Sequence, residues 1–438
     1  MDLTEEETLR ERKTPVRAAA QLKRVVGRVP SLWGRARPVT QEQHNERVLY
    51  IEMLFQAISS AGAFSFLAIF LVRLDAPNWL VGVYTSAPAL LTLLAVLPMG
   101  ALVQRQRSLV RVVNAARMTW RTVIASFALL VYLPVGIAPY IMVVAESLLS
   151  IPGAALNVAQ TTLLGQATSP ERRPRMLSTR MAIHGLVAAA VGFLAGQWLD
   201  SVAYPLNYQL LFVSAFVAGI GSVLTLSRIK LPEVTTQQIA ARTRVSIRQM
   251  IALVKATPPF RDYAITAFVF RMGQNLPLAL FAIYRVRTLG ASDAWIGVLL
   301  TVHRVLSVFA YVLLSRVLNQ AKYRKRLWIS CVGMALFPLA MALARTPEQL
   351  LYSAVLGGIF APGMDIFMTD TLFRVSTEED RPTFVAANTF LANVTAFAAP
   401  LLGTLLADVT FIRLALVAAT VLRAIGGLAF WRLGVGSE

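Results

Sequence analysis

Two stretches of this chain, 208 residues apart, resemble each other. Residues 161–180 read TTLLGQATSPERRPRMLSTR, and residues 369–388 read TDTLFRVSTEEDRPTFVAAN. The identical pairs are Thr161 with Thr369, Leu164 with Leu372, Glu171 with Glu379, Arg173 with Arg381 and Pro174 with Pro382, and Asp200 matches Asp408 at the same offset. Residues 74–83 (LDAPNWLVGV) and 289–298 (LGASDAWIGV) form a second match in the same order. Two ordered matches at similar offsets predict two homologous halves.

Each half contains six apolar segments, and a membrane-spanning helix needs about 20 such residues. A helix satisfies its own backbone groups inside lipid, and the sequence lacks the short alternating strands of a membrane barrel. The sequence therefore predicts an all-α polytopic membrane protein with about twelve transmembrane helices in two pseudo-symmetric six-helix bundles. The segments are 48–72, 79–103, 112–134, 138–164, 177–198, 206–227, 262–284, 294–318, 327–345, 349–373, 384–406 and 411–431.

Polar stretches divide the chain around these segments. Residues 1–47 are predicted to be a cytoplasmic N-terminal tail, either disordered or forming a basic amphipathic helix on anionic lipid. The first six-helix half spans 48–227, a cytoplasmic linker spans 228–261, and the second half with a short C-terminal tail spans 262–438. Within the linker, 245–254 (VSIRQMIALV) has apolar residues at helical spacing, which predicts a surface helix.

The composition excludes several other classes of protein. Hydrophobic residues make up 56% of the chain and charged residues 15%, with a mean hydropathy of +0.60, whereas a soluble domain has about 25% charged residues. The net charge of +19 lies between the apolar runs, which is typical of topology signals and not of nucleic-acid binding. One cysteine (Cys331) and three scattered histidines predict no disulfide, metal site or cofactor, and the sequence has no ATP-binding phosphate loop.

Lysine and arginine are distributed unevenly across the predicted membrane. With the N-terminus inside, 31 of the 42 basic residues fall in the tail, the linker and the inner loops. The five in outer loops are Arg73, Arg285, Arg287, Arg345 and Arg413. This bias predicts a multi-pass protein of the cytoplasmic membrane with both termini in the cytoplasm.

The two six-span halves resemble the Major Facilitator Superfamily, whose transporters contain parallel repeats. The family's loop after the second span usually reads G-x-x-x-D-R-x-G-R-[RK]. Here 98–111 (PMGALVQRQRSLVR) keeps Gly100 and the basic residues but has Gln104 at or beside the acidic position. The second copy, 313–326 (LLSRVLNQAKYRKR), keeps only the basic cluster. The resemblance covers 48–432 and implies the fold, but the acidic residue that usually locks the cytoplasmic side is missing.

Two further signatures of the family are absent, and both concern the solute. The fourth span has Glu146 near the position where drug antiporters usually carry an arginine. The fifth span has Gly192 and Gly196 without a proline between them, so these glycines predict helix packing and not binding. The sugar-porter signature after the sixth span is replaced by RIKLPEV. The resemblance therefore implies a carrier fold without naming its solute.

The resemblance also ranks the charges within the spans, each of which is costly to insert and is a functional candidate. Spans one, four, seven and ten line the central cavity in the family. Arg271 in span seven and Asp365 in span ten lie at similar depth from the cytoplasmic end. We expect a direct or water-bridged pair, which either fixes the two helices or provides an anion site and a proton site. The repeat places Asn157 opposite Asp365, so only one half carries this acid.

Glu146 is the second candidate for coupling. It lies eight residues from the outer end of span four, and a carboxyl group removed from water can exchange a proton near neutral pH. Arg304 and His303 in span eight lie at comparable depth and are expected partners across the two halves. The alternative is a glutamate whose side chain reaches the outer water.

Gln274 and Asn275, beside Pro277 in span seven, form a polar cluster. Proline frees a backbone carbonyl, and bent cavity helices often supply solute contacts. By contrast, Glu52 is expected at a solvated interface, one turn inside the first span. Arg117 and Arg121 in span three are expected to reach the cytoplasmic interface with their long side chains, so we assign these three charges no solute role. 

Together these features predict a secondary active transporter that moves a small solute by alternating access, with the proton as coupling ion and efflux as direction. It is expected to act as a monomer in the bilayer without a cofactor. The alternative is a transporter-like scaffold or sensor without net transport, which has little reason to keep charges in the membrane. A membrane-embedded transferase would need catalytic residues in an interface loop, and the loops are too short, so no enzyme activity is predicted.

The charge bias makes the topology testable. Reporter fusions at residues 30 and 438 should both report a cytoplasmic location, because the basic residues favour the inner side of the membrane. A fusion at residue 75, in the first outer loop, is the matched control and should report the opposite side. External placement of either terminus would contradict the topology.

Overall fold

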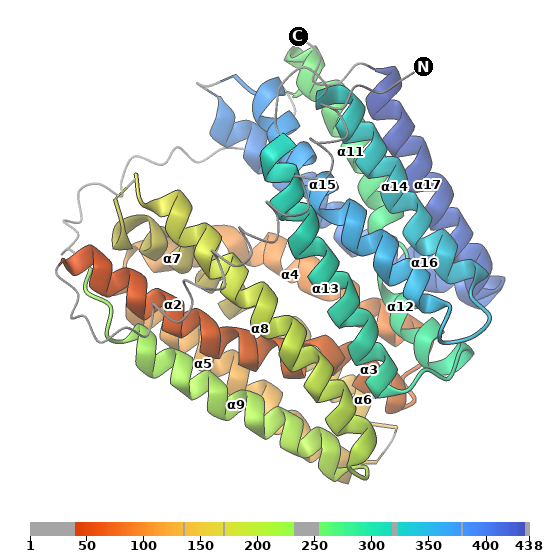
Figure 1. Cartoon of the computed structure of the whole chain (residues 1–438), viewed down its shortest axis with the longest axis horizontal. Helices are drawn as coiled ribbons and strands as arrows, with labels where there is room; N and C mark the ends of the chain where they lie inside the picture. The colour runs from red at the N-terminus through yellow and green to blue at the C-terminus, as the bar shows by residue number, and fades with distance from the viewer. Residues whose placement is uncertain are drawn as a thin grey trace, which may run out of the picture.

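The computed structural model describes residues 40–134, 136–169, 171–231, 254–317, 323–377 and 380–433. All regular elements in these ranges are helical, and they form two bundles (Figure 1). The prediction of an all-α fold with about twelve membrane helices in two halves is confirmed. The N-terminal tail up to residue 39 and the linker helix predicted at 245–254, except for its last residue Val254, lie outside the described residues.

The first half contains six helical spans, two of which are interrupted. The first span is α2 (Gln41–Ser59), η2 (Ser60–Phe64) and α3 (Ser65–Arg73), and the fourth is α6 (Ala138–Leu148) and α7 (Ser150–Ala167). The other spans are α4 (Asn78–Gln104), α5 (Leu109–Ser126) with η3 (Phe127–Tyr132), α8 (Arg173–Ser201) and α9 (Leu206–Leu226).

The second half also contains six spans. Its first is broken into α11 (Pro258–Asn275), α12 (Leu278–Ile283) and η5 (Tyr284–Thr288). The others are α13 (Asp293–Val317), α14 (Tyr323–Leu343), α15 (Leu350–Val375), α16 (Arg381–Val409) and α17 (Ile412–Arg432).

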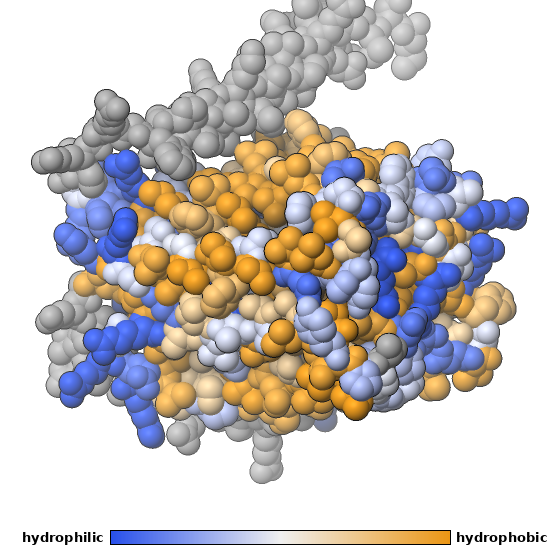
Figure 2. All heavy atoms as spheres, turned by 90° about the horizontal axis from the view of Figure 1, so that it is seen from below, coloured by the Kyte–Doolittle hydropathy of each residue, from blue (hydrophilic) through white to orange (hydrophobic). Residues whose placement is uncertain are grey.

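The outer surface is suited to lipid. Among the described residues, eleven helices are long and apolar enough to cross a membrane. The remaining predicted span, α5 with η3, is not among the eleven because the 18 residues of α5 include three arginines, Arg111, Arg117 and Arg121. Figure 2 shows hydrophobic side chains over most of one face, with hydrophilic ones mainly toward its left and right edges. Leu194, Val217 and similar side chains are more than half exposed, as expected for residues that face acyl chains.

The two halves meet along two helix pairs, α8 with α13 and α4 with α16. At the first pair the helices touch through glycine. A Cβ atom on Gly196 would lie 2.6 Å from the carbonyl oxygen of Asp293 and 3.0 Å from the Cα atom of Gly297. The predicted packing role of Gly196 is therefore confirmed, because a larger residue would push the halves apart.

Polar contacts also join the halves at the end where span one meets span two. Arg73 forms an ion pair with Asp293 at 2.8 Å, and the Tyr208 hydroxyl donates to the same carboxylate at 3.0 Å. Arg287 donates to the side chain of Asn78 at 2.8 Å. We call these contacts the interhalf latch. In Figure 1 the two bundles converge at this end and diverge toward the end where residues 231 and 254 border the linker.

The core of the first half contains an ion network that corrects the expectation for Glu52. Its side chain is 0% exposed, not solvated. It pairs with Arg117 of α5 at 2.5 Å and with Arg180 of α8 at 2.8 Å, and the Ser222 hydroxyl of α9 donates to it at 3.3 Å. The position of Glu52 along the span predicts its depth in the membrane but not the direction in which its side chain points. In the structure this side chain points from α2 into the bundle.

The sequence-based expectation for Arg117 and Arg121 is also wrong. Their side chains do not reach the interface but are buried. Arg117 also donates to the side chain of Gln160 at 3.2 Å. Arg121 donates to the carbonyl oxygen of Gly219 at 2.9 Å and to the side chain of Gln56. Partners inside the bundle replace the water that these guanidinium groups would otherwise have to reach.

Neutralising Glu52 should destabilise the first half strongly. Glu52→Gln leaves Arg117 and Arg180 buried without a counter-charge, and removing one member of a buried pair typically costs about 3–5 kcal/mol. The matched control is Glu46→Gln on the same helix, because Glu46 pairs with the 41%-exposed side chain of Arg172. That variant should lose at most about 1 kcal/mol. Thermal unfolding of the purified variants in detergent measures both, and equal losses would contradict the assigned role of Glu52.

Candidate functional site

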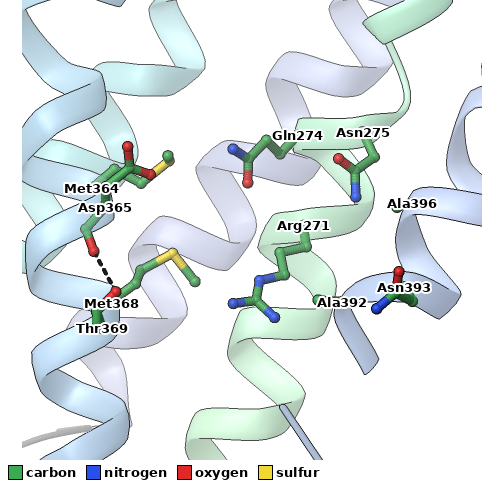
Figure 3. A pocket seen from close by; sticks show the side chains of 10 residues that line it. All are labelled: Arg271, Gln274, Asn275, Met364, Asp365, Met368, Thr369, Ala392, Asn393 and Ala396. Atoms are coloured by element: carbon green, nitrogen blue, oxygen red, sulfur yellow. Dashed lines mark hydrogen bonds between the residues drawn. The ribbon is translucent and has the colours of Figure 1, made fainter. Parts of the chain in front are cut away.

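The second half contains a pocket of about 380 Å³ between α11, α15 and α16. Four residues selected from the sequence line it: Arg271, Gln274, Asn275 and Asp365. Its other lining residues are Met364, Met368, Thr369, Ala392, Asn393 and Ala396 (Figure 3). The volume lies within the range of about 300–1,000 Å³ that is usual for small-molecule sites.

The α11 wall of the pocket is basic and polar. Arg271, Gln274 and Asn275 share one face because they lie three or four residues apart. Nη1 of Arg271 donates to the backbone and side-chain oxygens of Asn388 on α16, at 3.2 and 3.1 Å. Nδ2 of Asn275 donates to the Thr395 hydroxyl at 3.1 Å. These bonds to α16 fix the side chains while most donors of the guanidinium group stay available.

The α15 wall carries the acid. The Tyr311 hydroxyl of α13 donates to Oδ2 of Asp365 at 3.2 Å, and the Thr369 hydroxyl donates to the backbone oxygen of Asp365 at 2.8 Å. Met364 and Met368 lie on the same face, one residue before and three residues after Asp365. The wall therefore combines a carboxylate with flexible, polarisable thioether groups.

Of the two forms of pairing expected for Arg271 and Asp365, direct or bridged by water, the direct ion pair is not formed in the structure. Arg271 binds Asn388, and Asp365 binds Tyr311, so each charge uses a neutral partner from a different helix. The sequence placed the two charges at similar depth, and both line the same pocket. The sequence does not predict the direction around its helix in which each of these side chains points. That direction determines which group the side chain contacts. Without a direct pair, removing both charges is not expected to restore the stability lost by removing one.

The helix break beside the pocket follows from Pro277. Proline has no backbone N–H, so the carbonyl of Gly273 loses its usual helical donor. Arg423 of α17 replaces that donor, because its Nε donates to the oxygen of Gly273 at 3.0 Å. Its Nη1 and Nη2 donate to the oxygens of Met334 and Gln274, at 2.9 and 3.0 Å. The predicted bend in span seven is therefore present, and a buried arginine satisfies the carbonyl groups around it.

Glycine allows this contact to form. A Cβ atom on Gly273 would lie 2.6 Å from the backbone nitrogen of Arg423, so only glycine lets α11 approach α17 this closely. The side chains of Gln274 and Asn275 are thus held at the pocket from behind. Arg423 is a positioning residue and does not line the pocket itself.

The remaining candidates lie elsewhere. Glu146 on α6 is 8% exposed, and neither Arg304 nor His303 pairs with it among the described residues. Arg304 donates instead to the Ser65 hydroxyl at 3.3 Å, and the His303 ring packs beside Gly357. Asn157 is exposed on α7 and does not line the pocket. Arg304 and His303 were expected as partners of Glu146 only because they lie at a comparable depth. In the structure they contact Ser65 and Gly357 instead.

Several pocket residues were not selected from the sequence, although a signal for them exists. Met368 and Thr369 lie three and four residues after Asp365 and so lie beside it on the helix, and Met364 lies one turn before Met368. Thr369 also aligns with Thr161 in the repeat, and each donates to the carbonyl four residues earlier, at 2.8 and 2.7 Å. Listing the helical neighbours of each in-span charge would have found this wall.

The family profile of the Major Facilitator Superfamily matches residues 49–352 and 265–437. The chain belongs to this family, and it is thus a transporter of the secondary class rather than an enzyme. No curated protein sequence matches the chain.

Solved structures share the fold at low sequence identity. A bacterial homologue of the human lysosomal transporter Spinster, inward-facing and unoccupied, matches with a TM-score of 0.65 and 12% identity, over 90% of this chain and 97% of the other. The nucleoside transporter NupG matches with a TM-score of 0.68 and 12% identity, over 90% and 100%. The human organic anion transporter MFSD10 matches with 0.61 and 13%, over 90% and 100%. These likenesses show the fold alone.

Replacing Arg423 should destabilise the broken helix. Arg423→Gln leaves carbonyl groups of α11 and α14 without donors, and each unsatisfied buried group costs about 1–3 kcal/mol. Arg432→Gln, in the exposed last turn of the same helix, is the matched control and should change stability little. Adding Pro277→Ala to Arg423→Gln should recover part of the loss, because alanine restores the N–H that can bind Gly273. Thermal unfolding measures all three, and no recovery would argue against the assigned role.

Proposed function

We propose that this protein is a proton-coupled secondary transporter that exports a small solute across the cytoplasmic membrane by alternating access. The pocket of α11, α15 and α16 forms the second-half side of the solute site. The observation that carries this proposal is the presence of Arg271, Gln274, Asn275 and Asp365 on the walls of one pocket. Charges are costly inside a membrane, and their concentration at a cavity favours binding over scaffolding.

The contacts between the halves support alternating access. The interhalf latch joins them at one end, and they diverge toward the end that borders the linker. Exposure of the site to the other side requires the latch to open. Its bonds are short polar contacts between loops and helix ends, and the backbone contact at Gly196 and Gly297 lies beside it, where the bundles would change their angle.

Two carboxyl groups are available for proton coupling. Glu146 is buried on α6, and its Oε2 atom has no hydrogen-bond partner among the described residues. A buried carboxyl group without a counter-charge favours its neutral form, so proton binding and release there depend on access to water. Asp365, which is exposed to the pocket and bound to Tyr311, is the second candidate. We assign the proton to Glu146 because it is buried and its Oε2 has no hydrogen-bond partner among the described residues, whereas Asp365 is exposed and accepts a bond from Tyr311.

The remaining features of the proposal follow from the sequence. We propose that the protein acts as a monomer in the bilayer of the inner membrane with both termini in the cytoplasm. We also propose that 48–227 and 262–438 are duplicated halves joined by the linker 228–261. The sequence match between 161–180 and 369–388 supports the duplication.

A sensor or scaffold without net transport is the alternative. The relatives of known structure differ in the solutes that their names give, nucleosides for NupG and organic anions for MFSD10, so the fold alone does not choose a solute. A thermal-shift screen of the purified protein would first identify a ligand. Flux of that ligand in proteoliposomes then separates the two functions, because a sensor binds the ligand without moving it.

Proton-driven flux should depend on Glu146. In proteoliposomes with an imposed pH gradient, Glu146→Gln should lose the acceleration of solute flux by the gradient, because glutamine cannot bind and release a proton. The control is Glu348→Gln in an exposed loop, which should keep it. Thermal unfolding should show that both variants are folded. An unchanged response to the gradient in Glu146→Gln would remove Glu146 from the coupling mechanism, and absence of any flux in the wild type would favour the sensor.

A further inference from the structure

We infer that the pocket of α11, α15 and α16 recognises a zwitterionic solute, with the anionic group of the solute on Arg271 and its cationic group on Asp365. This inference rests on the proposed function, because it takes the pocket as the solute site. It adds the chemical class of the solute to that function.

Opposite charges lie on facing walls of this pocket. In Figure 3 the side chains of Arg271 and Gln274 extend from α11 toward α15, which carries Asp365. Among the described residues neither charge has an ion partner, and each has one neutral partner, Asn388 or Tyr311. Neutral partners orient a charged group but do not cancel its charge. The pocket therefore presents one positive and one negative wall at the same time.

Donors and acceptors remain available on both walls. A guanidinium group has five N–H donors, and the bonds to Asn388 use only Nη1 of Arg271. An ionised carboxylate accepts through two oxygens, and the bond from Tyr311 uses only Oδ2 of Asp365. The free edge of Arg271 fits a carboxylate or another planar anion, and Oδ1 of Asp365 fits an ammonium group.

A solute with a single charge would match only one wall. A monoanion on Arg271 would share the pocket with Asp365, and a monocation on Asp365 would share it with Arg271. In both cases one wall charge stays without a counter-charge in a site partly removed from water, which is unfavourable. A zwitterion gives each wall a counter-charge and leaves the occupied pocket electrically neutral.

The other lining residues are consistent with a small zwitterion. Met364 and Met368 offer flexible apolar contacts to the part of the solute between its charged ends. Gln274 and Asn393 offer amide groups to further polar atoms. The volume of about 380 Å³ is near the lower limit for small-molecule sites, which favours a compact solute.

A series of unbranched amino acids tests the inference. Calorimetric titration of the full-length protein in detergent would use the series from glycine to ε-aminocaproate, whose ammonium and carboxylate groups are separated by increasing numbers of methylene groups. Each member has two singly charged counterparts, such as caproate and hexylamine. The zwitterion of the best length should bind about 10- to 100-fold more tightly than either counterpart, because each counterpart loses one charged contact.

Two variants, each of which replaces one charged side chain with a neutral one, identify which wall binds which end of the solute. Asp365→Asn should bind the zwitterion no more tightly than the monoanion, and Arg271→Gln should bind it no more tightly than the monocation. Asp370→Asn on α15 and Arg261→Gln on α11 are matched controls, because both side chains are about half exposed and outside the pocket. Both controls should keep the preference of the wild type.

Three results would overturn the inference: a monoanion that binds the wild type as tightly as its zwitterion, no binding by any member of the series, or an unchanged preference in Asp365→Asn. The proposed transport function is tested separately by uptake of the same probes into proteoliposomes. Selective binding without uptake would refute transport and support the assignment of the pocket. Uptake without selectivity for zwitterions would refute the assignment alone.

Discussion

A polar group inside the membrane must find its partner within the protein, and this constraint determines how the second half is assembled. Arg423 meets it without a carboxylate partner among the described residues, by donating to the carbonyl oxygens of Gly273, Gln274 and Met334. The same three bonds connect α11, α14 and α17. They also stabilise the break that Pro277 causes, and the pocket depends on that break because Gln274 and Asn275 lie directly before it.

The two halves satisfy this constraint in different ways. In the first half, Glu52 is enclosed by Arg117 and Arg180, and all three side chains are almost completely buried. In the second half, Arg271 and Asp365 are left with neutral partners on the walls of a pocket. The first arrangement fixes helices, because its charges are already used. The second leaves donors and acceptors of both charged groups unused, so the two halves differ in the charged groups that they leave available.

Much of the architecture could be predicted from the sequence, because hydrophobic length and the position of Pro277 act locally along the chain. The twelve spans and the broken helix were read in this way, and Arg271, Gln274, Asn275 and Asp365 do share a pocket. The partners of the charges could not be predicted in the same way. Position in a span gives depth, whereas pairing depends on helix rotation and on neighbours that are distant in sequence. For this reason Glu52 was placed in solvent, and Asn388 and Tyr311 were not foreseen as partners.

The glycine contact between α8 and α13 has a mechanical consequence. Backbone meets backbone at Gly196 and Gly297, so no interlocked side chains resist a change in crossing angle there. From Gly196 to the start of α8 at Arg173 the lever arm is about 35 Å at 1.5 Å per residue, and a rotation of about 10° would move that end by about 6 Å. Asp293 lies at the contact itself, so the latch would move much less. If the halves rotate about this contact while the contacts farther along α8 and α13, at Gly185 and Val308, slide, the movement is large at one membrane face and small at the other, where it breaks the bonds of the latch.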